Sequence, residues 1–294
     1  MDIKEFGINM TRKLESILGE GFETEFKEVI KNNGVKYHAV LIREKNQNVA
    51  PTIYLEHFFD EYQKGKDEDM IAKEILALYK HSMPSDLLDV QFFTDFSKAC
   101  RNFCFKAVNY EKNKKKLGNI PYKRFEDLAF IPFCCVSSSR FGEGSITILN
   151  KHLRFWEVSF DELWENVFEN AASTLPPYCE NLMDFVNAHE ELPFPPMNCN
   201  MYVVSNNIKT NGASAIFYPG MLEKMEEEIG GDFVIIPSSI HETIVLPRID
   251  EDDELSVLKM MVKQVNTEVV STEEILSDSV YVYDSETKRL TALE

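Results

Sequence analysis

The sequence lacks the features that mark membrane and secreted proteins. No run of about eighteen apolar residues occurs anywhere in its 294 residues. The first residues, MDIKEFGINM, contain no apolar core of signal-peptide length. The six cysteines are too sparse for a disulfide scaffold, and none stands in a Cys-x-x-Cys pair. We therefore expect a protein that does not associate with membranes, located in the cytoplasm.

Signals for nucleotide and metal sites are also absent. The stretch FGEGSITIL completes neither the Walker spacing nor Gly-x-Gly-x-x-Gly. The six histidines are scattered without metal-ligand spacing. His241-Glu242 resembles the start of a zinc-protease motif, but Val245 stands where the second histidine would be needed. The sequence therefore predicts no metal and no cofactor.

Positive charge is scarce overall and concentrated in one place. The net charge is −18, which argues against binding nucleic acid or an anionic membrane. Between residues 101 and 124, however, eight basic residues face one acidic residue, Glu111. This segment is either a solvated turn around EKNKKKLGN or a patch that docks an acidic surface, on another protein or on a second copy of this chain. The candidate partner-binding residues are Lys112, Lys114, Lys115, Lys116, Lys123 and Arg124.

What the sequence does contain is a globular composition with clear local signals. Hydrophobic residues make up 44% and aromatic residues 12% of the chain, far from the composition of disordered proteins. Apolar spacing predicts a helix over residues 2–19. Asn33-Gly34 predicts a type I′ hairpin, because both residues tolerate positive φ. Ser159 and Glu162 form a capping-box pattern that predicts a helix start at Ser159.

The arrangement of these elements predicts the fold class. Strands and helices alternate without a regular βαβ repeat, and several strand pairs are typical of hairpins, so we predict an α+β fold with mainly antiparallel sheets and two lobes. Five prolines fall between residues 176 and 196. We accordingly place an N-terminal α+β lobe at residues 1–176, a proline-rich connection at 177–197 and a C-terminal α+β lobe at 198–294.

The C-terminal third gives further local predictions. The segment ASAIFY, residues 213–218, is predicted to be a strand after an Asn211-Gly212 turn. Ser271 and Glu274 repeat the capping-box spacing and predict another helix start. In FVIIPSSIHETIVLP, residues 233–247, two short β-branched runs flank a polar break. We predict a strand on each side of this break and place His241 and Glu242 on the second strand.

Ser239, His241 and Glu242 admit two interpretations. Strand alternation would place Glu242 in a row with Ile240 and Ile244, and a carboxylate in an apolar row needs a partner. In the structural interpretation Glu242 accepts hydrogen bonds from backbone N–H groups. In the functional interpretation the three side chains form the polar cluster of a hydrolase-type enzyme. A serine elbow of the Gly-x-Ser-x-Gly type is not present.

Several longer segments resemble a known family. They are GASAIFYPGMLEKMEEEIGGDFVIIPSSIHETIVLP, MVKQVNTEVVSTEEILSDSVYVYD, IPYKRFEDLAFI and SITILNKHLRFWEVSFDELWENVFENA. Together they resemble an uncharacterised bacterial domain-of-unknown-function family that is common in gut-dwelling Gram-positive anaerobes, along the whole chain. A second uncharacterised bacterial family is similar more distantly. The resemblance implies one bacterial cytoplasmic family fold and carries no catalytic residue.

Two classes of function remain open at this stage. The first is a non-enzymatic acidic protein that acts by protein–protein interaction. The second is a hydrolase-type enzyme that uses Ser239, His241 and Glu242. We favour the first, because a catalytic constellation usually leaves a recognisable spacing in the sequence.

Overall fold

The computed structural model describes residues 1–45, 50–82, 91–138, 142–182, 200–248 and 252–293. Contacts divide the chain into two compact units. Residues 1–90 with 138–142 form the first, and residues 91–137 with 143–294 form the second. The connection predicted at 177–197 falls inside the second unit, and its part from residue 183 onward lies outside the described residues. The lobe boundaries predicted at residues 176 and 198 stay a prediction.

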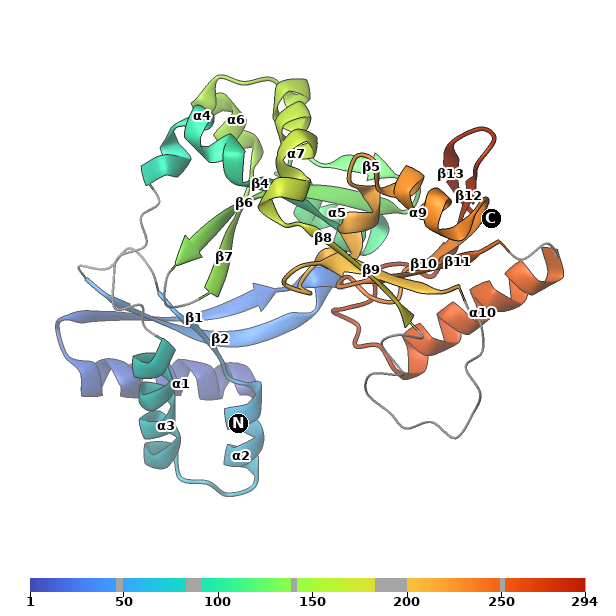
Figure 1. The fold of residues 1–294 in the computed structure, drawn as a ribbon. Coiled ribbons are helices and arrows are strands. Elements are labelled where there is room, and N and C mark those ends of the chain that lie inside the picture. The colour runs from blue at the N-terminus through green and yellow to red at the C-terminus, as the bar shows by residue number, and fades with distance from the viewer. Residues whose placement is uncertain (46–49, 83–90, 139–141, 183–199, 249–251, 294) are drawn as a thin grey trace. The chain divides into compact units, whose positions relative to one another are not determined.

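The first unit packs helices on a three-stranded antiparallel sheet of order β1-β2-β3 (Figure 1). Its elements are α1 (Ile3–Leu18), β1 (Phe22–Ile30), the 3-10 turn η1 (Asn32–Gly34), β2 (Lys36–Glu44), β3 (Thr52–Tyr54), α2 (Glu56–Gln63) and α3 (Glu68–Ser82). The predicted first helix is confirmed: the Asp2 carboxylate accepts the Glu5 N–H at 2.8 Å, and Gly19 ends the helix with φ +75°. Phe6, Met10 and Leu14 are buried on its inner face.

The hairpin predicted at Asn33-Gly34 is confirmed. β1 and β2 pair antiparallel up to Ile30 opposite Lys36. Asn33 has φ 55° and ψ 23°, Gly34 has φ 75°, and the Val35 N–H donates to the Asn32 carbonyl at 3.2 Å. Positive φ at both central residues is the requirement of a type I′ turn, which follows the right-handed twist of the strands.

The second unit contains two antiparallel sheets. The first half of its chain forms η2 (Gln91–Thr94), α4 (Phe96–Ala99), η3 (Cys100–Asn102), β4 (Phe103–Asn109), α5 (Tyr110–Leu117), β5 (Lys123–Phe125), β6 (Leu128–Ser138), β7 (Gly142–Thr147), α6 (Asn150–Trp156) and α7 (Phe160–Thr174). The second half forms β8 (Pro177–Asn181), β9 (Tyr202–Asn206), η4 (Gly212–Phe217), α9 (Met221–Ile229), β10 (Phe233–Ile236), β11 (Thr243–Pro247), α10 (Asp252–Glu268), β12 (Tyr281–Asp284) and β13 (Arg289–Ala292). One sheet has the order β4-β6-β5, with β7 also on β6, and the other has the order β13-β12-β10-β11-β9-β8. The predicted α+β class with mainly antiparallel sheets is confirmed.

In each of these two sheets, successive residues of a strand point to opposite faces, and each face packs against a different core. On β6, Phe130 joins the main core, whereas Ala129 and Ile131 pack with Leu117 beneath α5. On β10, Phe233 joins the main core, whereas Val234 packs beneath α10. Both sheets are therefore apolar on both faces, and α5 and α10 each cover a small core of their own.

The helix start predicted at Ser159 is confirmed. The Ser159 hydroxyl accepts the Glu162 N–H at 3.1 Å, which satisfies a donor of the first turn. Trp164 is fully buried, and its indole N–H donates to the Pro121 carbonyl at 2.8 Å. This bond fixes α7 against the connection that leads into β5.

Two predictions in the C-terminal third are wrong. Residues 213–218 are not a strand, because η4 spans Gly212–Phe217. Residues 212–216 are all buried, so the sequence has no alternation of apolar and polar positions here. A short run of this kind does not distinguish a strand from a helix. Ser271 does not begin a helix but a turn, in which the Glu274 N–H donates to the Ser271 carbonyl at 2.8 Å.

Candidate functional site

The predicted polar cluster lies in the loop between β10 and β11. The two strands pair as far as Ile236 opposite Ile244, so residues 237–242 form the connection. The placement of His241 and Glu242 on a strand is wrong, since β11 begins at Thr243. The prediction failed because the apolar alternation in the sequence begins at Ile240, before the first residue of β11.

His241 is held from several directions. Its backbone N–H donates to the Ser239 hydroxyl at 3.0 Å, and its carbonyl accepts the Ser205 hydroxyl at 2.8 Å. Nδ1 of the ring accepts the Asn211 N–H at 3.2 Å, and Nε2 lies 3.7 Å from the Glu274 carboxylate. Because an imidazole nitrogen that accepts a backbone N–H carries no proton, the neutral ring bears its proton on Nε2, toward Glu274.

The contacts of Ser239 and Glu242 differ from those of a hydrolase triad. In the part of the chain that the structure describes, the Ser239 hydroxyl contacts the backbone of His241 and not its ring. The Glu242 carboxylate makes no hydrogen bond with the described residues; its backbone carbonyl accepts the Ser239 N–H at 3.2 Å. The three residues are close because they are neighbours in the sequence, but the Ser239 hydroxyl and the His241 ring are not aligned as a nucleophile and its base.

The rest of the loop is fixed through its backbone. The Ile240 N–H donates to the Glu274 carbonyl at 2.8 Å, and the Ala213 N–H donates to the Ile240 carbonyl at 3.2 Å. Gly212 packs so tightly here that a Cβ would lie 2.2 Å from Ser205 Oγ and 2.7 Å from the His241 carbonyl oxygen. These contacts describe a tight structural connection.

The lysine-rich segment forms a helix, so the predicted turn is wrong. α5 begins where the Asn109 side chain accepts the Lys112 N–H at 3.0 Å. Asn113 and Leu117, one helical turn apart, are the buried residues of this helix. All four lysines of α5 are exposed. With so few apolar positions, the segment carries almost no helical periodicity in its sequence.

Arg124 and Lys114 both lie at the ring of Tyr110. The Arg124 guanidinium carbon lies 4.2 Å from the ring centroid, and the Lys114 ammonium lies 5.5 Å from it. Arg124 is paired with Ala129 across the sheet, on the face that α5 covers.

Lys123 belongs to the opposite face. It pairs with Phe130, and its ammonium lies 5.6 Å from the Trp164 ring and 5.2 Å from the Phe168 ring on α7. The six residues predicted as one patch are therefore divided by strand alternation. We call the retained set, Lys112, Lys114, Lys115, Lys116 and Arg124, the α5 basic surface.

Lys114, Lys112 and Lys115 have little acidic compensation. Glu111 is 3.4 Å from Lys114, and both side chains are mostly exposed, so this ion pair is weak. Lys112 and Lys115 have no ion pair with the described residues. Close to Arg124 and Lys114, a hydrogen bond with Tyr110 raises the pKa of Tyr122, which keeps that phenol protonated. The surface thus offers ammonium, guanidinium and hydroxyl donors side by side.

The half-buried carboxylate of Asp127 links the start of α5 to the C-terminal part of the second unit. Asp127 Oδ2 accepts the Ser277 hydroxyl and Oδ1 accepts the Tyr281 hydroxyl, each at 2.5 Å. The Asp127 carbonyl accepts the N–H of Tyr110, the first residue of α5, at 2.8 Å. Ser277 and Tyr281 are fully buried, and burial followed by the Asp127 charge raises the pKa of Tyr281. The sequence did not predict this contact, because Asp127 is 150 or more positions from Ser277 and Tyr281 and no local pattern links residues so far apart.

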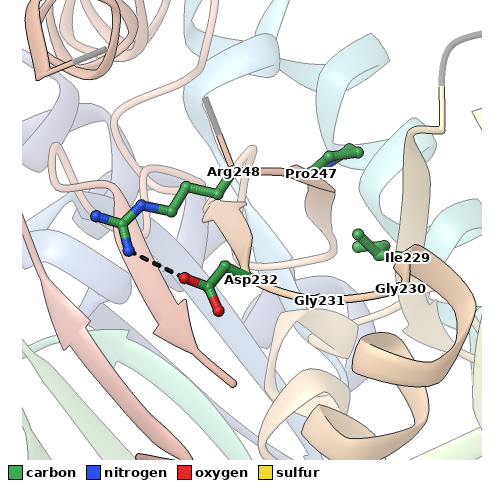
Figure 2. A pocket seen from close by; sticks show the side chains of 6 residues that line it. All are labelled: Ile229, Gly230, Gly231, Asp232, Pro247 and Arg248. Atoms are coloured by element: carbon green, nitrogen blue, oxygen red, sulfur yellow. Dashed lines mark hydrogen bonds and ion pairs between the residues drawn. The ribbon is translucent and has the colours of Figure 1, made fainter. Parts of the chain in front are cut away.

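An open depression of about 420 Å³ lies at the start of β10, and Figure 2 shows the residues that line it. It is lined by Ile229, Gly230, Gly231, Asp232, Pro247 and Arg248. The Asp232 carboxylate accepts the Ser285 N–H at 2.8 Å, the Ser285 hydroxyl at 2.6 Å and the Arg248 guanidinium at 3.1 Å. These bonds, led by the Ser285 hydroxyl, hold the pKa of Asp232 below its usual range. Because its charged groups already satisfy one another, the depression is assigned no ligand.

The described residues contain no group of three or more His, Cys, Asp or Glu side chains arranged to hold a metal ion. None of the helices that the structure describes is long and apolar enough to cross a membrane.

Comparison with known proteins identifies a family for the chain but no activity. No curated protein and no solved structure was found to match it. Residues 3–285 match a family described as "Family of unknown function (DUF5688)". The match covers nearly the whole chain and confirms the resemblance to a domain-of-unknown-function family. The chain belongs to the family of unknown function DUF5688.

Proposed function

We propose that this chain acts by protein–protein interaction in the cytoplasm, and that the α5 basic surface binds an acidic segment of a partner protein. The observation that carries the proposal is a set of five exposed cations, four on α5 and Arg124, which lies over the ring of Tyr110 at the start of α5, in a chain whose net charge is −18. An isolated basic surface on a strongly acidic protein selects partners by electrostatic complementarity and speeds their encounter.

The geometry favours an acidic peptide over a polyanion. A nucleic acid or an anionic membrane extends beyond the contact site, so the −18 net charge would repel the parts that do not touch α5. A short acidic segment avoids this repulsion, because the Debye length is about 8 Å at physiological ionic strength. An acidic region of a second copy would meet the same chemical requirement.

The hydrolase alternative receives no specific support. It needs the His241 ring to take a proton from Ser239, whereas the ring accepts the Asn211 N–H and Ser239 contacts a backbone N–H. It stays a prediction that a screen for hydrolase activity can test.

A charge-reversal experiment tests the proposed function. A fluorescent glutamate-rich peptide is titrated with the parent protein, with Lys112→Glu/Lys115→Glu, and with Lys73→Glu/Lys80→Glu on α3 as a control with the same charge change. We expect the α5 variant to lose at least tenfold in affinity and the control to stay close to the parent. Equal losses in both variants would show only a net-charge effect and would contradict a localised site. Absence of parental binding would also contradict the proposal.

A further inference from the structure

α10 is apolar on two sides. Its inner side, with Leu255 and Val262, packs on Val234 and Val280 in a small core. Its outer side carries large apolar residues that are exposed: Val257 (49%), Met260 (65%), Met261 (56%), Val265 (47%) and, just beyond the last turn, Val269 (77%). We call these five residues the α10 ridge. An ordinary surface helix is polar on its outer side, so the ridge needs an explanation.

The spacing of the ridge matches that of a helix–helix contact. Val257, Met261, Val265 and Val269 follow one another at intervals of four, which is the i±4n row that packs between the rows of a second helix. Methionine side chains are flexible and polarisable and are used at binding surfaces. A contiguous exposed apolar patch of a few hundred Å² marks an interaction site.

Charge around the ridge is unusual for this chain. Residues 255–267, LSVLKMMVKQVNT, contain no acidic residue, although the chain as a whole carries 49 of them. Lys259 and Lys263 are the charged residues of this segment, and Lys259 donates to the Leu293 carbonyl at 2.8 Å. Glu268, beside Val269, is the one acidic residue within the span of the ridge, so two copies of an acidic protein can meet near Met261 with few carboxylates close to one another.

We propose that the α10 ridge binds the same ridge of a second copy, forming a two-fold symmetric dimer. A two-fold contact uses one patch twice, and crossing near Met261 places Val257 of each copy against Val265 of the other. Ridges of the i±4n type cross at about −50°, which keeps the helix ends of the two copies apart. A specific dimer needs about 1,000 Å² of total buried surface, so most of the exposed apolar area near the crossing point must enter the contact.

The dimer does not depend on the proposed function, because the α10 ridge and the α5 basic surface share no residue. A failure of either proposal leaves the other intact. If both hold, the dimer carries two α5 basic surfaces, and a partner with two acidic segments binds with higher avidity than a partner with one.

The test is the molar mass in solution. We compare the parent, Met261→Asp and Met70→Asp by multi-angle light scattering and sedimentation equilibrium. Met70 lies on α3 and is 54% exposed, so its substitution introduces the same charge at an equivalent helix position. We expect dimers for the parent and Met70→Asp, and a dimer dissociation constant at least tenfold higher for Met261→Asp. A parent that is monomeric at its solubility limit, or an unchanged Met261→Asp dimer, would overturn the proposal.

A cross-linking variant covers the case in which Met261→Asp fails to fold. Because the two-fold axis passes near Met261, Met261→Cys should form a covalent dimer on mild oxidation, seen on a non-reducing gel. Met70→Cys is the control and should remain mostly monomeric. Equal cross-linking of the two variants would contradict a contact between two copies at α10. The same result is expected if the ridge binds an apolar helix of a different protein.

Discussion

Asp127 accepts a hydrogen bond from Tyr281 at 2.5 Å across 154 positions of the chain. This bond joins the turn between β5 and β6 to the strand β12 near the C-terminus. The same turn contacts the start of α5 through the Asp127 carbonyl. The Tyr281 side chain is 1% exposed, so the bond forms where water cannot replace it.

We expect removal of this contact to destabilise the second unit. Tyr281→Phe leaves Asp127 with one donor fewer and should lower the free energy of unfolding by about 1–3 kcal/mol. Asp127→Asn should have a similar effect. In a double-mutant cycle followed by urea denaturation, the two losses should be coupled by about 1 kcal/mol or more. Strictly additive losses would mean that the bond contributes nothing of its own.

Gly212 should not tolerate a side chain. A Cβ there would lie 2.2 Å from Ser205 Oγ and 2.5 Å from the Asn206 backbone nitrogen, so the backbone of η4 or β9 must move. We expect Gly212→Ala to lower the free energy of unfolding by about 3 kcal/mol or more, measured by thermal and urea denaturation. Gly21→Ala is the matched control, because a Cβ at Gly21 meets nothing within 4 Å. Equal stability of the two variants would disprove the tight packing.

His241 and Glu242 should differ when each is replaced. His241→Ala removes the acceptor of the Asn211 N–H and should lower the free energy of unfolding by about 1–2 kcal/mol. Glu242→Ala removes a carboxylate that makes no hydrogen bond with the described residues, so we expect a change within about 0.5 kcal/mol. Thermal melts of both variants check this order. The reverse order would restore the interpretation in which Glu242 ties down the loop.

Asp232 should contribute to stability only while it is ionised. Its pKa is lowered in the folded protein, first by the Ser285 hydroxyl, so its contribution is present above the unfolded pKa near 4 and is lost as pH falls through the lower folded value. At pH 7, Asp232→Asn should be less stable than the parent by about 1 kcal/mol, and the difference should shrink below pH 4. Urea denaturation across this pH range checks the trend. A difference independent of pH would assign the effect to packing.

Comparison of sequence and structure shows which features are local. The turn at Asn33-Gly34 and the cap at Ser159 were predictable, because their energies depend on residues within a few positions of each other. The hairpin of β10 and β11 was predictable from two β-branched runs, although its loop was assigned too few residues. In each case the signal lies within one stretch of chain.

Other features depend on contacts that no pattern records. The lysines of α5 lie on a helix whose Leu117 packs with Ala129 and Ile131 of β6, a contact that the charge of the segment does not reveal. The division of Lys123 from Arg124 follows from a strand of three residues, too short to be recognised by alternation. Residues 212–216 of η4 are all buried, so this segment shows no alternation between apolar and polar positions.

The most direct measurement of the central claim is an NMR titration of the isotope-labelled protein with a glutamate-rich peptide. Binding at the α5 basic surface predicts shift changes concentrated at the amides of residues 110–117 and 122–126, weakening as salt is raised. The amides of residues 237–242 should remain unperturbed. Shift changes that avoid α5, or the absence of any change at low salt, would contradict the account.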